Sequence, residues 1–107
     1  RENTGLEREV KVKAAFIEDF LTREIKSISP EIDIRGIGLI WGIDLANFGG
    51  EPLAKTITSR CFELGLIVER VGRNDTVLKI LPPLSIEMST LQKGCSILKQ
   101  AFSECVA

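Results

Sequence analysis

Lys79 is the residue whose surroundings point most directly to chemistry. It lies in the middle of the apolar run Val77-Leu78-Lys79-Ile80-Leu81, directly before Pro82-Pro83. A lysine in such a run either extends its ammonium group to solvent from an edge strand or points into a cleft. In a cleft it would be a fixed positive charge that meets an anion, or an amine able to form a Schiff base. The solvent-exposed interpretation is the simpler one, and the residues alone leave all three open.

Other groups that commonly carry catalysis are missing or isolated. The chain contains no histidine, which removes the commonest general base and the commonest metal ligand. Cys61, Cys95 and Cys105 form no C-x-x-C pair, and each falls on the apolar stripe of a predicted helix. We therefore expect buried thiols and no metal site. The G-x-G at residues 36–38 lacks the third glycine of a dinucleotide-binding fingerprint. The adjacent Arg35 is expected to be structural and to bond backbone carbonyls at a bend.

The composition is that of a globular protein with no strong preference for a charged partner. The chain has 107 residues, of which 44% are hydrophobic and 27% charged, and its net charge is −1. This length predicts a single domain over residues 1–107. The balanced charge argues against nucleic acid and anionic membranes as partners. No apolar run approaches the length of a membrane span.

Two extended segments, Ile32–Arg35 and Ile37–Leu45, are predicted near the centre of the chain. From Ile37 onward the odd positions are apolar, as in a half-buried strand, and Trp41 is expected in the core. The parity changes at residues 35–36, so a bulge or sharp bend is predicted there. Glycines on one face of a strand predict close packing against its backbone. Three are expected to share a face: Gly36, Gly38 and Gly42.

Apolar residues spaced three and four apart predict helices over about residues 6–28, 51–64 and 87–104. The charged residues of the first helix, Lys13 among them, are expected to face solvent, and Gly65 is expected to cap the second helix in the left-handed conformation. Residues 66–71 and 76–81 are rich in β-formers and are joined by four turn residues, which predicts an antiparallel hairpin. The order α-β-β-α-β-β-α predicts an α+β fold: an antiparallel sheet of three to four strands with helices packed on one face.

Three motifs in this order resemble a known family. They are R-G-I-G-L-I-W-G-I-D-L from Arg35, C-F-E-L-G-L-I-V-E-R from Cys61 and L-K-I-L-P-P-L-S-I from Leu78. Together they look like the C-terminal small domain of class III (fold type I) aminotransferases, most similar to the diaminobutyrate–2-oxoglutarate subgroup. In that pattern the structural motif residues are Arg35, Gly36, Gly38, Pro82 and Pro83.

The resemblance implies a pyridoxal-phosphate enzyme whose cofactor is bound by a large domain that precedes these residues. Lys79 would then not be the Schiff-base lysine. It stands where many class III enzymes carry an arginine that binds a substrate carboxylate, so we expect it to bind substrate. The implied reaction moves an amino group between 2,4-diaminobutyrate (or aspartate 4-semialdehyde) and glutamate or 2-oxoglutarate, in ectoine-type biosynthesis. The resemblance also implies amino-acid and 2-oxo-acid partners, a cytoplasmic homodimer, and a small domain that closes over the active site and is inactive alone.

Other functions fit the same residues. A different class III aminotransferase, of the ornithine, 4-aminobutyrate or acetylornithine type, would share the motifs. A free-standing α+β regulatory module that binds a small molecule, or a pure interaction domain, would share the fold.

Overall fold

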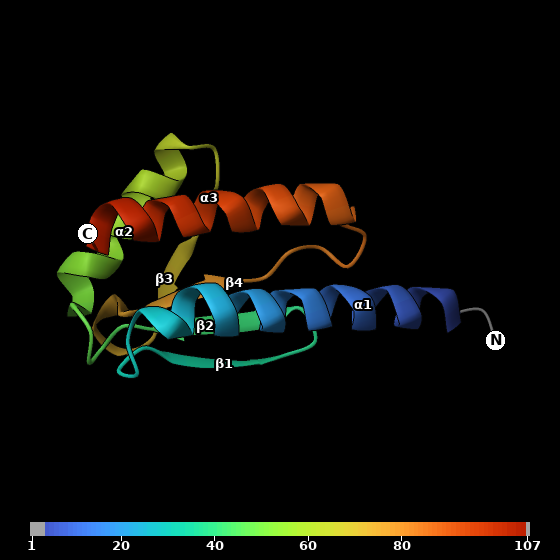
Figure 1. Cartoon of the computed structure of the whole chain (residues 1–107), viewed down its shortest axis with the longest axis horizontal. Coiled ribbons are helices and arrows are strands. Elements are labelled where there is room, and N and C mark those ends of the chain that lie inside the picture. Colours follow the sequence, from blue (N-terminus) through green and yellow to red (C-terminus); the bar gives the residue numbers. More distant parts are fainter. Residues whose placement is uncertain (1–3, 107) are drawn as a thin grey trace.

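A computed structural model of the chain describes residues 4–106. Its long helices are separated by pairs of short strands, in the order predicted from the sequence (Figure 1). The helices are α1 (Thr4–Phe20), α2 (Gly50–Glu63) and α3 (Met88–Val106), and the strands are β1 (Asp33–Ile37), β2 (Ile40–Asp44), β3 (Glu69–Val71) and β4 (Val77–Ile80).

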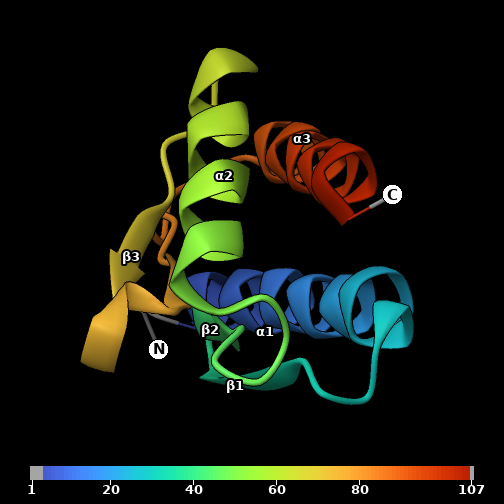
Figure 2. The same ribbon diagram turned by 90° about the vertical axis from the view of Figure 1, so that its left-hand side faces the viewer.

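The four strands form one sheet in the order β1-β2-β4-β3, and every neighbouring pair is antiparallel. Figure 2 shows the three helices on the same side of this sheet. Ile34, Ile43 and Leu78 are opposite one another in register and point toward the helices. The predicted α+β fold is therefore confirmed. We call the other side of the sheet the uncovered face; in register it carries Asp33, Arg35, Ile37, Ile40, Gly42, Asp44, Glu69, Val71, Val77 and Lys79.

The break between the first two strands lies later in the chain than predicted. Instead of a bend at residues 35–36 followed by one long strand, β1 runs on to Ile37, which pairs with Ile40 across a two-residue turn. Gly38 makes this turn possible because its φ is +58°, a left-handed conformation that glycine adopts without strain. The turn was not recognisable in the sequence because Leu39 is buried and its apolar side chain continues the alternating pattern of β2.

The three glycines do not share one face, as the sequence analysis expected. Gly36 lies opposite Trp41 on the helix-facing side, whereas Gly42 lies opposite Arg35 on the uncovered face. The expected close packing holds at Gly36, because a Cβ atom there would overlap the ring of Trp41. Trp41 is 8% exposed, which confirms it as a core residue.

The first helix does not run as a regular α-helix to Pro30. After Phe20 it widens into one π-helical turn, Leu21–Ile25, and then tightens into a 3-10 turn, Lys26–Ile28. The wide turn keeps Leu21 and Ile25 fully buried. Lys26 Nζ then donates hydrogen bonds to the carbonyl oxygens of Pro30, at 3.0 Å, and Ile32, which joins the end of this helix to the start of the sheet.

The second half of the chain follows the predictions with shorter strands. Gly65 has φ +102° directly after α2, as expected of a left-handed cap. The hairpin of β3 and β4 is antiparallel, but β3 has three residues and residues 66–68 form no strand. The buried ends of α2 and α3 meet over this hairpin through Ile57, Cys61, Leu98 and Phe102. No helix within residues 4–106 is long and apolar enough to span a membrane.

Candidate functional site

Lys79 lies on β4, which is an inner strand between β2 and β3 rather than an edge strand. The edge strand that the solvent-exposed interpretation assumed is therefore not observed, whereas the role of Lys79 stays a prediction. Its Cα is opposite Gly42 on one side and Glu69 on the other, so its side chain belongs to the uncovered face. The residue is half-buried. Gly42 carries no side chain, but a Cβ atom there would lie 3.1 Å from Val77 Cγ1, so Val77 partly fills the space between Lys79 and β2.

Arg35 occupies the same face but is already paired. Its Nη1 donates to Asp33 Oδ2 at 2.7 Å and its Nη2 to Asp44 Oδ2 at 3.1 Å. The expected bonds to backbone carbonyls are therefore wrong. Asp44 is fixed in turn by the backbone N–H of Ala46, which donates to Oδ1 at 2.9 Å. This network ties β1 and β2 to the loop that leads into α2, and it leaves Arg35 less available than Lys79 to a ligand.

The glycines and prolines of the motifs lie at the turns that set the position of these strands. Trp41 Nε1 donates to the carbonyl oxygen of Gly38 at 2.7 Å, so the indole closes the β1–β2 turn while its ring covers Gly36. Pro82 and Pro83 follow β4 after one intervening residue, and the Pro83 carbonyl accepts a hydrogen bond from Ile86 N at 3.0 Å, which turns the chain toward α3.

An apolar cavity of about 290 Å³ lies where this end of β4 meets α3. Its lining comes from residues 66–68, the stretch from Lys79 to Pro83 and the inner side of α3, including Leu91 and Cys95. Burial raises the pKa of the Cys95 thiol to about 11, so this group stays protonated and behaves as a small apolar side chain. The cavity therefore suits an apolar group, with Lys79 at its border as the one charged residue of the lining.

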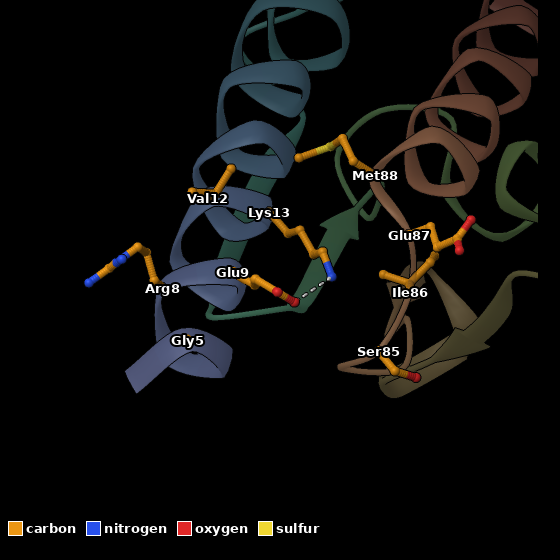
Figure 3. Close-up of a pocket in the computed structure, with 9 residues that line it drawn as sticks. All are labelled: Gly5, Arg8, Glu9, Val12, Lys13, Ser85, Ile86, Glu87 and Met88. Carbon is orange, nitrogen blue, oxygen red and sulfur yellow. Dashed lines mark ion pairs between the residues drawn. The ribbon is translucent and has the colours of Figure 1, made fainter. Parts of the chain in front are cut away.

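A wider pocket of about 620 Å³ was not anticipated from the sequence (Figure 3). It lies between the projecting N-terminal half of α1 and the segment 85–88, and Lys13 and Met88 reach into it. Lys13 was expected on the solvated face but is only 7% exposed, and its ion-pair partner Glu9 lies 4.0 Å away. Its position three residues after Val10 and four before Ile17 is the signal that could have revealed this burial.

The cysteines are unevenly buried. Cys61 is fully buried, whereas Cys95 and Cys105 are half-buried, so the expectation of core thiols holds fully for the first alone. All three are free thiols, and burial raises the pKa of Cys61 to about 11. Within residues 4–106, no three His, Cys, Asp or Glu side chains are grouped so that they could hold a metal ion.

A family profile, related sequences and solved structures all match this chain to aminotransferases. The sequence profile of the family described as aminotransferase class-III matches residues 2–102. A diaminobutyrate–2-oxoglutarate transaminase of Wolinella succinogenes is 40% identical over 97 residues, covering 89% of this chain and 22% of that protein. One of Marinococcus halophilus is 41% identical over 103 residues, covering 95% of this chain and 23% of that protein. A PLP-bound aminotransferase mutant from Vibrio fluvialis superimposes with a TM-score of 0.78 at 25% identity, over 97% of this chain and 24% of that one.

Proposed function

Because the chain belongs to the class III aminotransferase family, whose profile spans residues 2–102, we propose that it is the C-terminal small domain of a pyridoxal-phosphate transaminase. The complete enzyme would move an amino group between 2,4-diaminobutyrate and 2-oxoglutarate. The observation that carries this proposal is identity of 40% and 41%, along most of the chain, to two relatives with that named activity. The chain spans less than a quarter of the length of either relative.

The uncovered face supports a role as one wall of a larger structure. Large apolar side chains remain exposed on it, with Ile37 at 79% and Ile40 at 52%. Exposed apolar groups gathered on one face are typical of a contact surface for another part of a protein. We propose that the large domain of the same enzyme lies against this face, so that Lys79 points toward the interior of the enzyme rather than toward solvent.

Lys79 is proposed to bind a substrate carboxylate. Its ammonium group is a point charge with three donors, so it can bind a carboxylate without the two-pronged geometry that an arginine imposes. It lies on an inner strand whose neighbours fix its position, and the side chain beside it on β2 is absent because that residue is Gly42. The distal carboxylate of 2-oxoglutarate is the group that it would hold.

The cavity beside Lys79 does not fit pyridoxal phosphate itself. The cavity beside Lys79 is lined mainly by apolar side chains, and no second cation lies in that lining to meet a phosphate group. When bound, the cofactor supplies the electron sink for amino transfer, and we propose that it is held by the remainder of the enzyme. The free thiols are typical of a reducing compartment and support the further proposal of a cytoplasmic location. The further proposal of a role in ectoine-type synthesis rests on the similarity to diaminobutyrate–2-oxoglutarate transaminases. A homodimeric complete enzyme stays a prediction from the family resemblance.

The complete enzyme tests the function directly. With pyridoxal phosphate, 2,4-diaminobutyrate and 2-oxoglutarate it should form glutamate. Failure to form glutamate from this donor would refute the proposed substrate, and failure with every amine donor would refute the transaminase. The isolated 107-residue chain, by contrast, should show no saturable attachment of pyridoxal phosphate after borohydride reduction, because the cofactor lysine lies elsewhere.

The role of Lys79 needs a matched pair of variants. Lys79→Met in the complete enzyme should lower kcat/KM for 2-oxoglutarate roughly ten- to a hundred-fold, the worth of one hydrogen bond to a charged group. Lys11→Met changes an exposed lysine of α1 and should leave that value unaltered. Equal kinetics for the two variants would return Lys79 to a structural role.

A further inference from the structure

Five charged side chains lie on the uncovered face, and three of them are engaged in ion pairs with one another. Arg35 is paired with Asp33 on β1 at 2.7 Å and with Asp44 on β2 at 3.1 Å. The other two are Glu69 and Lys79. Within residues 4–106, neither of these makes an ion pair with another residue. By contrast, the half-buried Arg60 and Arg70 both form ion pairs with glutamates. One anion and one cation on this face therefore remain available to a ligand.

The strand register sets these two charges side by side. Glu69 on β3 and Lys79 on β4 are direct partners in an antiparallel pair. Side chains of direct partners leave the same face of the sheet with their Cβ atoms about 5 Å apart. An amino-acid head group carries a carboxylate and an ammonium on a single carbon atom. Two opposite charges at this spacing, on a rigid sheet, are complementary to such a head group.

We propose that Glu69 and Lys79 together bind the α-amino acid head group of the amino donor. Lys79 holds the α-carboxylate and Glu69 holds the α-ammonium. The inference rests on the proposed function, since 2,4-diaminobutyrate has two amines of which one must be presented for transfer. Holding the α-ammonium at Glu69 directs the 4-amino group toward the cofactor. Glu69 is thereby a specificity-determining residue, and it selects the donor rather than the acceptor.

The two substrates make different demands on the pair. 2-Oxoglutarate has a distal carboxylate and no ammonium group, so it needs Lys79 and gains nothing from Glu69. The carboxylate of Glu69 would repel the carboxylate of the keto acid, because both are negatively charged. Removing the charge of Glu69 should therefore impair use of the diamino acid and spare or improve use of the keto acid, whereas removing the charge of Lys79 should impair both.

The experiment compares two donors in the complete enzyme. 4-Aminobutyrate equals 2,4-diaminobutyrate without the α-amino group, so it cannot use Glu69. Glu69→Gln should lower kcat/KM for 2,4-diaminobutyrate roughly ten- to a hundred-fold and leave that for 4-aminobutyrate unchanged or higher. Glu31→Gln, at an exposed glutamate before β1, is the matched control and should alter neither.

Each outcome decides between the proposals. If wild-type enzyme transfers the amine of 2,4-diaminobutyrate and Glu69→Gln keeps its preference for this donor, the pairing is refuted and the proposed function stands. An equal loss of kcat/KM with both donors also refutes it, because a merely structural effect would not depend on whether the donor carries an α-ammonium group. If the wild-type enzyme uses no diamino acid, the proposed function itself fails. Thermal unfolding of both variants checks that they fold like the wild type.

Discussion

Replacing Gly36 by alanine tests how the β1–β2 hairpin is built. An added Cβ atom would overlap the indole ring of Trp41 and lie 2.7 Å from the carbonyl oxygen of Ile40. The carbonyl belongs to the backbone of the paired strand, so it cannot rotate away as a flexible side chain would. Either the ring moves off the strand or the two strands separate locally, and both changes destabilise the folded chain.

The magnitude follows from what the ring would lose. Overpacking a core costs about 1–3 kcal/mol when neighbours can adjust. Loss of the hydrogen bond from Trp41 Nε1 to the Gly38 carbonyl adds about 0.5–1.5 kcal/mol. Full expulsion of the ring would cost about 4–6 kcal/mol, from 150–250 Å² of buried aromatic surface at about 25 cal/mol per Å². We expect Gly36→Ala to lower the free energy of unfolding by about 2–4 kcal/mol, since partial adjustment falls between these limits.

Urea unfolding followed by tryptophan fluorescence measures this value, because Trp41 is the sole tryptophan of the chain. Gly94→Ala is the matched control. It makes the same substitution inside α3, where the added Cβ would meet Leu66 Cδ1 at an ordinary 3.6 Å, and it should stabilise the chain by about 0.5–1 kcal/mol. A Gly36→Ala variant with unaltered emission and a loss below about 0.5 kcal/mol would refute the packing of the ring on the backbone.

Three further changes should alter stability in stated directions. Leu78→Ala removes a fully buried side chain between the sheet and the helices, and it should lower the free energy of unfolding by about 2–5 kcal/mol in the same titration. Burial raises the pKa of the Cys61 and Cys95 thiols to about 11. Unfolded thiols ionise at lower pH than these, so stability should fall as the pH rises from about 9 toward 11, and the fall should shrink in a Cys61→Ala, Cys95→Ala variant. Hydrogen bonds from Arg60 and Gln100 lower the pKa of Glu104. Its contribution should be complete above the unfolded pKa and disappear as the pH falls through the lower folded value, and Glu104→Gln should abolish that part of the acid profile.

The elements of the fold were predictable because each is encoded locally. Helical stripes, a proline in the first turn of α2 and a glycine after it need no knowledge of distant residues. The break between β1 and β2 was misplaced for a physical reason. A turn residue, Leu39, is buried in a core that is formed by residues far apart in the chain, so its apolar character resembles that of a strand residue. Lys13 was misplaced in the same way, because the segment that covers it follows β4.

The candidate site was only partly accessible to sequence reasoning. Lys79 could be singled out by its apolar neighbours, which are local. That it lies on an inner strand depends on the order β1-β2-β4-β3, which joins the two hairpins through β2 and β4. The engagement of Arg35 by carboxylates on both sides depends on the pairing of Asp33 with Asp44 across the first hairpin. Neither relation follows from any single stretch of residues.

The pairing of Glu69 with Lys79 shows how one residue of loop length decides the chemistry of a face. A four-residue turn at residues 72–75 would pair Val71 with Thr76. In that register Glu69 would lie opposite Leu78 and not opposite Lys79. The actual loop includes Thr76, and Val71 pairs with Val77. The Thr76 carbonyl accepts a hydrogen bond from Leu45 N at 2.9 Å, which continues the register of β2 with β4, while Asn74 and Asp75 adopt positive φ within the loop. This shift brings Glu69 opposite Lys79 on the uncovered face. The register of this hairpin, with a loop over residues 72–76, therefore brings two opposite charges that are ten positions apart in the sequence to neighbouring positions on one face.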